Sequence, residues 1–202
     1  MKRVLVVLLV IAILVVTAKI FVCEIPVVTG NDMAPALQAG DRLLAYRLNT
    51  TPARGDLVLM EVPLSKQLLL RRVVAIPGDR IAVRDETPVL NGAPAKRKVQ
   101  RETTLRDPGG KELKVRVIEE EIGDGPRYLV MKDPRRRSVD AKEVSLSSAY
   151  YVLADHRNHG TDSRTFGPVD AAKIRAVITH RLSAGPAALA DLGPRAGWMA
   201  LR

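Results

Sequence analysis

The sequence predicts a mostly β protein, in which an antiparallel β domain carries a smaller inserted β subdomain and follows one N-terminal transmembrane helix. Short runs rich in Val, Leu and Ile alternate with Gly-Asp, Pro-Gly-Asp and Asn-Gly turns, which is typical of antiparallel strands. After residue 23, no long stretch has the periodicity of an amphipathic helix. The one long apolar run, residues 4–23, has the length of a membrane span.

The N-terminal segment, residues 1–23, is interpreted as an uncleaved membrane anchor. Residues 4–18 carry no charge, and Lys19 lies near the far end of the run, where its side chain can reach the membrane surface. A cleaved signal peptide is the competing interpretation, but the apolar run is too long and no small-x-small cleavage site follows it. Lys2 and Arg3 predict a cytoplasmic N-terminus, with the rest of the chain on the exported side.

Strand-like runs and turns divide the rest of the chain. In chain order the runs are Arg42–Tyr46, 56–62, 68–76, Arg80–Arg84, 113–119, 128–131, 150–154 and 174–180. Residues 24–92 and 149–182 are expected to form the main β domain. Residues 93–148 are more charged, have Gly-Pro breaks at 108–110 and 124–126, and are expected to form the inserted subdomain. Residues 183–202, rich in Ala, Gly and Pro, are expected to be a flexible tail.

Composition and charge argue against a nucleic-acid partner. The chain carries 32 Lys and Arg against 22 Asp and Glu, a net charge of +10, and only 3% of its residues are aromatic. The basic residues are spread without a dense stripe, and few rings are available to stack on bases. The basic runs 96–98 and 135–137 are interpreted as solvated faces or turns, with contact to anionic lipid headgroups as the alternative.

The sequence predicts neither a metal ion nor a cofactor. Cys23 is the single cysteine, which excludes an internal disulfide and a cysteine-based zinc site. His156 and His159 lie three residues apart in a polar stretch, which is poor evidence for a metal site without a third ligand, so they are interpreted as loop histidines.

Four segments, in this order, resemble the sequence boxes of the type I signal peptidases, the membrane-anchored serine–lysine proteases that remove leader peptides from exported proteins. Residues 29–37 are similar to the Ser-Met-x-Pro box that carries the nucleophile, and residues 40–44 with 52–58 to the second box. Residues 69–79 are similar to the lysine box, and residues 154–157 with 161–167 to the Gly-Asp-x-Arg and Asp-Ser-Arg box. The resemblance implies the family fold and an apolar surface beside a bacterial-type plasma membrane.

The resemblance also implies which residues form the site. Asp32 and Arg71 occupy the positions of the nucleophilic serine and of the lysine general base. Further positions are implied to support the site, namely Gly30, Met33, Pro35, Arg72, Asp155, Arg157, Asp162, Ser163 and Arg164.

The two replacements close the family's route of catalysis. That route needs a hydroxyl to attack the peptide carbonyl and a neutral amine to accept its proton. A carboxylate at Asp32 would have to form a mixed anhydride with an amide carbonyl. The guanidinium of Arg71 offers only donors, and arginine keeps its proton up to a pH of roughly 12 or more, so Arg71 cannot act as a general base.

Other arrangements of the same residues are open. Ser65-Lys66 is a displaced serine–lysine pair, in a stretch interpreted as a loop. An aspartic-protease site would pair Asp32 with Asp155 or Asp162, but an arginine nearby favours full ionisation over a shared proton. We predict instead that Asp32 and Arg71 face each other as an ion pair, which can form two parallel hydrogen bonds. Two independent losses of function are the alternative.

Four functions are weighed. The first is a non-cleaving, membrane-anchored signal peptidase homologue that binds exported or leader peptides as an assembly or accessory factor, with an intact signal peptidase or a secreted substrate as a further partner. The second is an active signal peptidase. The third is a self-cleaving domain of the transcriptional-repressor type, which the anchor and the lack of a DNA-reading motif argue against. The fourth is a structural exported β module.

Overall fold

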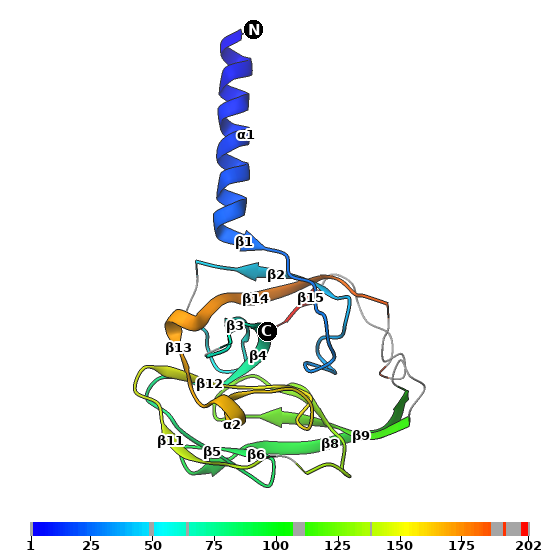
Figure 1. Ribbon diagram of the computed structural model, residues 1–202. Coiled ribbons are helices and arrows are strands. Elements are labelled where there is room, and N and C mark those ends of the chain that lie inside the picture. Colours follow the sequence, from blue (N-terminus) through cyan, green and yellow to red (C-terminus); the bar gives the residue numbers. More distant parts are fainter. Residues whose placement is uncertain are drawn as a thin grey trace.

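The computed structural model describes residues 2–48, 51–63, 65–106, 112–137, 139–186, 192 and 199–201, without the side chains of residues 15, 16 and 18–21. Helix α1 (Lys2–Val22) projects from a body built of β-sheets, and β1 (Cys23–Glu24) joins the two (Figure 1).

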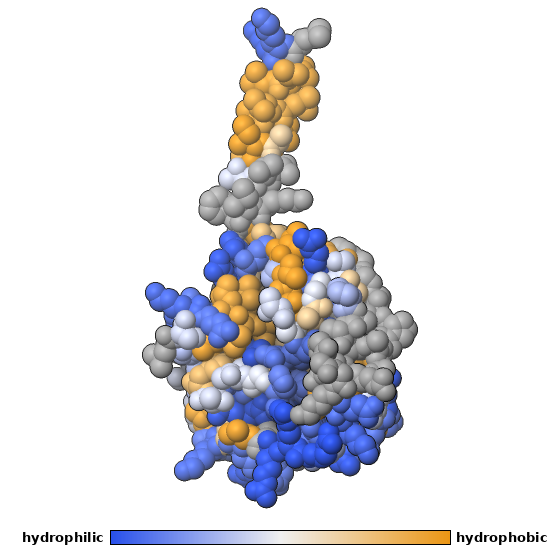
Figure 2. Space-filling view, turned by 45° about the vertical axis from the view of Figure 1, so that its right-hand side comes forward, coloured by the Kyte–Doolittle hydropathy of each residue, from blue (hydrophilic) through white to orange (hydrophobic). Residues whose placement is uncertain are grey.

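Helix α1 is continuous, and its apolar side chains are exposed. The large apolar residues from Val4 to Leu14 are 49–73% exposed, and hydrophobic residues cover most of this stretch in Figure 2. No helix in the described part of the chain is long and apolar enough for a membrane span. The transmembrane helix predicted over residues 4–23 is therefore not confirmed. The side chains of residues 15, 16 and 18–21, which belong to the predicted span, lie outside the described part of the chain.

The main sheet is antiparallel, in the order β1-β2-β14-β3-β4-β12-β13, with β15 also paired to β14. Its further strands are β2 (Arg42–Tyr46), β3 (Leu57–Glu61), β4 (Leu68–Ala75), β12 (Ala149–Leu153), β13 (Val169–Asp170), β14 (Ile174–Ser183) and β15 (Met199–Ala200). Successive residues of a strand point to opposite faces. Leu57 and Leu59 accordingly pack in one hydrophobic cluster, and Val58 and Met60 in another.

Two smaller sheets complete the body. One has the order β10-β9-β8, and the other the order β11-β5-β6-β7. Their strands are β5 (Arg80–Arg84), β6 (Thr87–Leu90), β7 (Ala93–Pro94), β8 (Lys96–Arg106), β9 (Glu112–Glu121), β10 (Tyr128–Lys132) and β11 (Ala141–Ser145). A short helix α2 (Ser163–Phe166) and a 3-10 turn (Ala171–Lys173) lie before β14.

The mostly β, antiparallel prediction is confirmed, and each of the eight predicted runs overlaps a strand. Strands β6, β8 and β11 and the two-residue strands β1, β7, β13 and β15 were not predicted. Residues 96–98 were interpreted as a solvated face or turn, but they begin β8, which pairs with β9 along its length. The turn interpretation of residues 135–137 agrees with the bond from Arg136 N to Asp133 O.

The division into a main domain and an insert stays a prediction. Strand β11, within the predicted insert, pairs with β5 outside it. Near the C-terminus, the expected tail contributes β15, and Leu201 packs against the main hydrophobic cluster.

Candidate functional site

A tight turn presents Asp32. The bonds Ala34 N to Asn31 O and Leu37 N to Met33 O close the turn at 3.1 and 2.8 Å. Met33, Ala34 and Leu37 are buried, which anchors the turn in the core. The side chain of Asp32 stays 32% exposed. Of the predicted supporting residues, Gly30, Met33 and Pro35 therefore flank Asp32 within this turn or beside it.

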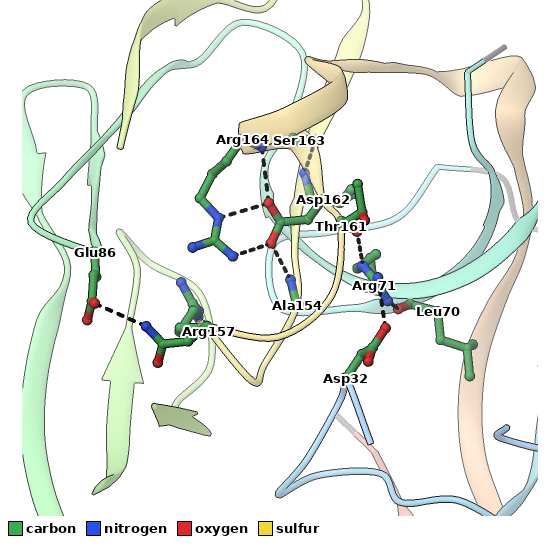
Figure 3. Close-up of polar contacts among 12 residues, drawn as sticks. Asp32, Leu70, Arg71, Glu86, Ala154, Arg157, Thr161, Asp162, Ser163 and Arg164 are labelled. Carbon is green, nitrogen blue, oxygen red and sulfur yellow. Dashed lines mark hydrogen bonds and ion pairs between the residues drawn. The ribbon is translucent and has the colours of Figure 1, made fainter. Parts of the chain in front are cut away.

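Strand β4 brings Arg71 to Asp32, as predicted. The Arg71 side chain is 2% exposed, and its Nη2 donates to Asp32 Oδ2 at 3.2 Å (Figure 3). The predicted pair of parallel bonds is not formed, because Arg71 Nε donates to Thr161 O at 2.7 Å and Nη1 to Leu70 O at 2.6 Å. Burial lowers the pKa of Arg71, and the carboxylate of Asp32 opposes this shift. The guanidinium remains a donor without an acceptor atom.

Arg72, the next residue, points to the other face of β4 and binds Asp155. The two contacts join Nε to Oδ1 at 2.7 Å and Nη2 to Oδ2 at 2.6 Å, and both side chains are buried. Arg72 also donates to Gly55 O at 2.7 Å and lies 4.2 Å from the ring centroid of Tyr128. This is the bidentate geometry that the sequence led us to expect for Asp32 and Arg71.

Asp162 and Ser163 hold the local backbone. Asp162 caps α2, accepts from Ala154 N at 3.0 Å, and binds the Arg164 guanidinium through both oxygens (Figure 3). Ser163 Oγ accepts from Val152 N at 3.0 Å. Among the described residues, neither side chain forms a hydrogen bond or ion pair with Asp32, and their role as supports of the site stays a prediction.

Arg157 points away from this pair. Its side chain is 1% exposed and binds Glu120 of β9, which is fully buried. Arg157, which belongs to the fourth sequence box, therefore connects the loop after β12 to the three-stranded sheet.

The two histidines interpreted as loop residues lie at the site. His159 Nδ1 is 3.5 Å from Asp32 Oδ1, and its ring stacks on that of His156 with 5.1 Å between the centroids. Burial, helped by His159, lowers the pKa of His156 to about 4. The only feature of the sequence that could have placed His156 at the site is its position between Asp155 and Arg157 in the fourth box.

Neither the displaced Ser65-Lys66 pair nor an aspartic-protease site finds support in the described residues. Ser65 and Lys66 lie in the exposed turn between β3 and β4. Asp155 and Asp162 each bind an arginine of their own, and no hydrogen bond among the described residues joins either to Asp32. No group of three His, Cys, Asp or Glu side chains in the described part of the chain is placed to hold a metal ion.

Comparison with known proteins gives consistent matches. Residues 1–149 match the family described as "Signal peptidase, peptidase S26". Signal peptidase I V of Bacillus subtilis is 31% identical over 155 residues, which cover 75% of this chain and 81% of that protein. Inactive signal peptidase IA of Staphylococcus aureus is 26% identical over 178 residues, 84% of each chain. A crystal structure of a signal peptidase I from Enterococcus faecalis aligns with 63% of this chain and 97% of that one, at 19% identity and a TM-score of 0.37.

Proposed function

Because the chain belongs to the signal peptidase family, peptidase S26, we propose that it is a non-cleaving member that binds exported or leader peptides as an assembly or accessory factor. The observation that carries this proposal is the Asp32–Arg71 contact at the place where the family needs a hydroxyl and a neutral amine.

The chemistry of the pair argues against cleavage. All three kinds of donor nitrogen on Arg71 are engaged, with Asp32, Leu70 O and Thr161 O. None of them can accept a proton from an attacking group. Asp32 is held as the partner of this cation, so it would be a poor nucleophile toward an amide carbonyl.

An open strand edge beside Arg71 supports peptide binding. Strand β12 pairs with β4 only at Arg72, Val73 and Ala75, so in the described part of the chain no strand covers residues 68–70 on that side. Val73 N donates to Asp56 O, and Val73 O accepts from Gly55 N, so the backbone groups of Val73 face the β3 side. Because backbone groups alternate along a strand, Leu68 and Leu70 face the open edge. An extended peptide can add to such an edge as a further strand.

The N-terminal segment is proposed to anchor the protein in a bacterial-type plasma membrane, with lipid as a partner. Residues 4–18 are uncharged in the sequence, and the apolar side chains from Val4 to Leu14 lie exposed on α1. Lys2 and Arg3 favour a cytoplasmic N-terminus and an exported body. A peptide site on the exported side would meet proteins as they leave the membrane.

The test is one incubation with two readouts. Detergent-solubilised full chain is mixed with a fluorescently labelled preprotein, and binding is followed by anisotropy and cleavage by gel. We expect saturable binding without cleavage. The variant Leu68→Pro removes an edge N–H and should weaken binding by about tenfold, whereas Leu68→Ala keeps it and controls for the lost side chain. Turnover by the unmodified chain would favour the alternative, an active signal peptidase.

A further inference from the structure

Residues 159–161, named here the strap, cross over the Asp32–Arg71 pair. Thr161 O accepts from Arg71 Nε at 2.7 Å, and His159 Nδ1 lies 3.5 Å from Asp32 Oδ1. A Cβ atom built on Gly160 would lie 2.8 Å from Asp32 Oδ2 and 3.0 Å from Arg71 Nη2. The backbone of the strap therefore rests directly on the pair.

Both ends of the strap are fixed to the body. Before it, Arg157 binds Glu120, and Asn158 Oδ1 accepts from Asp133 N. After it, Asp162 binds Arg164 and the backbone of Ala154. Between these ends, the strap meets the pair through the backbone oxygen of Thr161, which accepts from Arg71, and through the ring of His159, which contacts Asp32. Gly160 has φ +88°, a conformation that lets a short segment turn within three residues.

We propose that the Asp32–Arg71 pair holds this strap closed across the candidate site, and that a ligand reaches the buried guanidinium of Arg71 only when the strap lifts. Arg71 donates at once to the open edge of β4, at Leu70 O, and to the strap, at Thr161 O. Its guanidinium thus joins the two sides of the proposed peptide site. A lysine has one nitrogen at its tip and cannot reproduce this divergent set of contacts. Peptide entry rests on the proposed function, whereas strap closure is a property of the chain alone.

The three histidines of the chain provide a direct readout of strap opening. His156 is 7% exposed and lies under His159, which is itself 55% exposed. His180 lies in β14, away from the strap. Diethyl pyrocarbonate modifies accessible neutral imidazoles, and mass spectrometry resolves the rate at each histidine in the detergent-solubilised full chain at neutral pH.

We expect Arg71→Met, which removes the donor to Thr161 O, to raise the modification rate of His156 by about tenfold, because the rate follows the population of the open form. Gly160→Ala forces a Cβ onto the pair without changing any charge, and should raise it as well. Arg71→Lys should fall between these variants and the unmodified chain. The control Arg47→Met removes an arginine that binds Glu24, remote from the strap, and should change nothing.

The rate at His180 separates local opening from unfolding. A rise at His156 with a constant rate at His180 supports the strap. An unchanged His156 rate in both Arg71→Met and Gly160→Ala would overturn it, and so would a parallel rise at His180 in both variants. A chain that binds no leader peptide but shows the selective rise would refute the proposed function and leave the strap standing.

Discussion

Arg71 donates to Asp32 through one nitrogen only, with Nη2 at 3.2 Å from Oδ2. Its neighbour Arg72 binds Asp155 through two, at 2.7 and 2.6 Å. The difference follows from competition, because two backbone carbonyls take the remaining donors of Arg71. The Asp32–Arg71 contact is therefore one of three bonds that keep a buried guanidinium satisfied.

The first prediction concerns the coupling of this pair. Arg71→Met should destabilise the fold by about 2–4 kcal/mol, because two backbone oxygens and the Asp32 carboxylate each lose the hydrogen bond that Arg71 donates. Asp32→Ala should cost less, about 1–2 kcal/mol, because Arg71 keeps its two carbonyl partners. The double variant should recover part of the sum, with a coupling of about 1 kcal/mol. Urea denaturation of the four proteins measures the cycle.

A surface pair provides the control for this cycle. Arg47 and Glu24 form a contact whose arginine is far more exposed than Arg71, 31% against 2% of the side chain. The corresponding cycle with Arg47→Met and Glu24→Ala should be close to additive. Strict additivity for Asp32 and Arg71 too would mean that their contact does not stabilise the fold.

The second prediction concerns restoration of the family's chemistry. Asp32→Ser alone should not cleave a leader-containing substrate, because Arg71 still cannot accept the serine proton. Asp32→Ser combined with Arg71→Lys supplies both a hydroxyl and an amine that burial can deprotonate, and should give low but measurable cleavage. Gel assays of the single and double variants test this. Efficient turnover by the unmodified chain that disappears in Asp32→Ala would show that the carboxylate itself is catalytic.

The strands that the sequence predicted share one property, which is a run of branched apolar residues between turns. Strand β8 lacks it, since most of its residues are polar or charged. Contacts with β9 stabilise it instead: Lys96 Nζ lies 2.7 Å from Glu121 Oε1, and the buried Leu105 lies opposite Leu113. Strand β8 depends on pairing with β9, and the local sequence of residues 96–106 does not reveal that partner.

The site was predictable where the resemblance supplied positions, and less so where the fold supplied contacts. Aligning the boxes brought Asp32 and Arg71 together correctly. The approach of His159 to Asp32, 127 residues away in sequence, arises from the path of the loop after β12. A histidine in a polar loop has no periodic pattern that could reveal such a contact.

The third prediction concerns the buried pair on the other face of β4. Arg72→Lys should destabilise the protein by about 3 kcal/mol, because lysine loses the fork to Asp155, the bond to Gly55 O and the stacking on Tyr128. Arg80 is the matched control, since it lies 4.0 Å from Glu143 with both side chains exposed. Arg80→Lys should leave the melting temperature nearly unchanged. Equal effects of the two substitutions would contradict the structural role of Arg72.

The fourth prediction concerns topology. Lys2 and Arg3 ahead of an uncharged run favour a cytoplasmic N-terminus. An alkaline phosphatase domain fused after residue 202 should therefore be active, because the enzyme requires the exported compartment. A cytoplasmic reporter fused at the same place should be inactive. The reverse pair of results would refute both the anchor orientation and the proposed place of action.

The last prediction concerns acid stability through His156. Burial is the main cause that lowers its pKa from 6.5 to about 4; His159 and Arg136 lower it further, and Asp32 and the backbone of Asn31 oppose them. Between these values the unfolded chain binds more protons than the folded one, so His156 favours folding fully above pH 6.5 and loses this contribution as the pH falls toward 4. The loss is at most about 3 kcal/mol. Carboxylates titrate in the same range, so the measurement compares the unmodified chain with His156→Gln by urea denaturation at several pH values. The variant should show the flatter dependence between pH 4 and 6.5, and parallel curves would mean that His156 is as readily protonated in the folded chain as in the unfolded one.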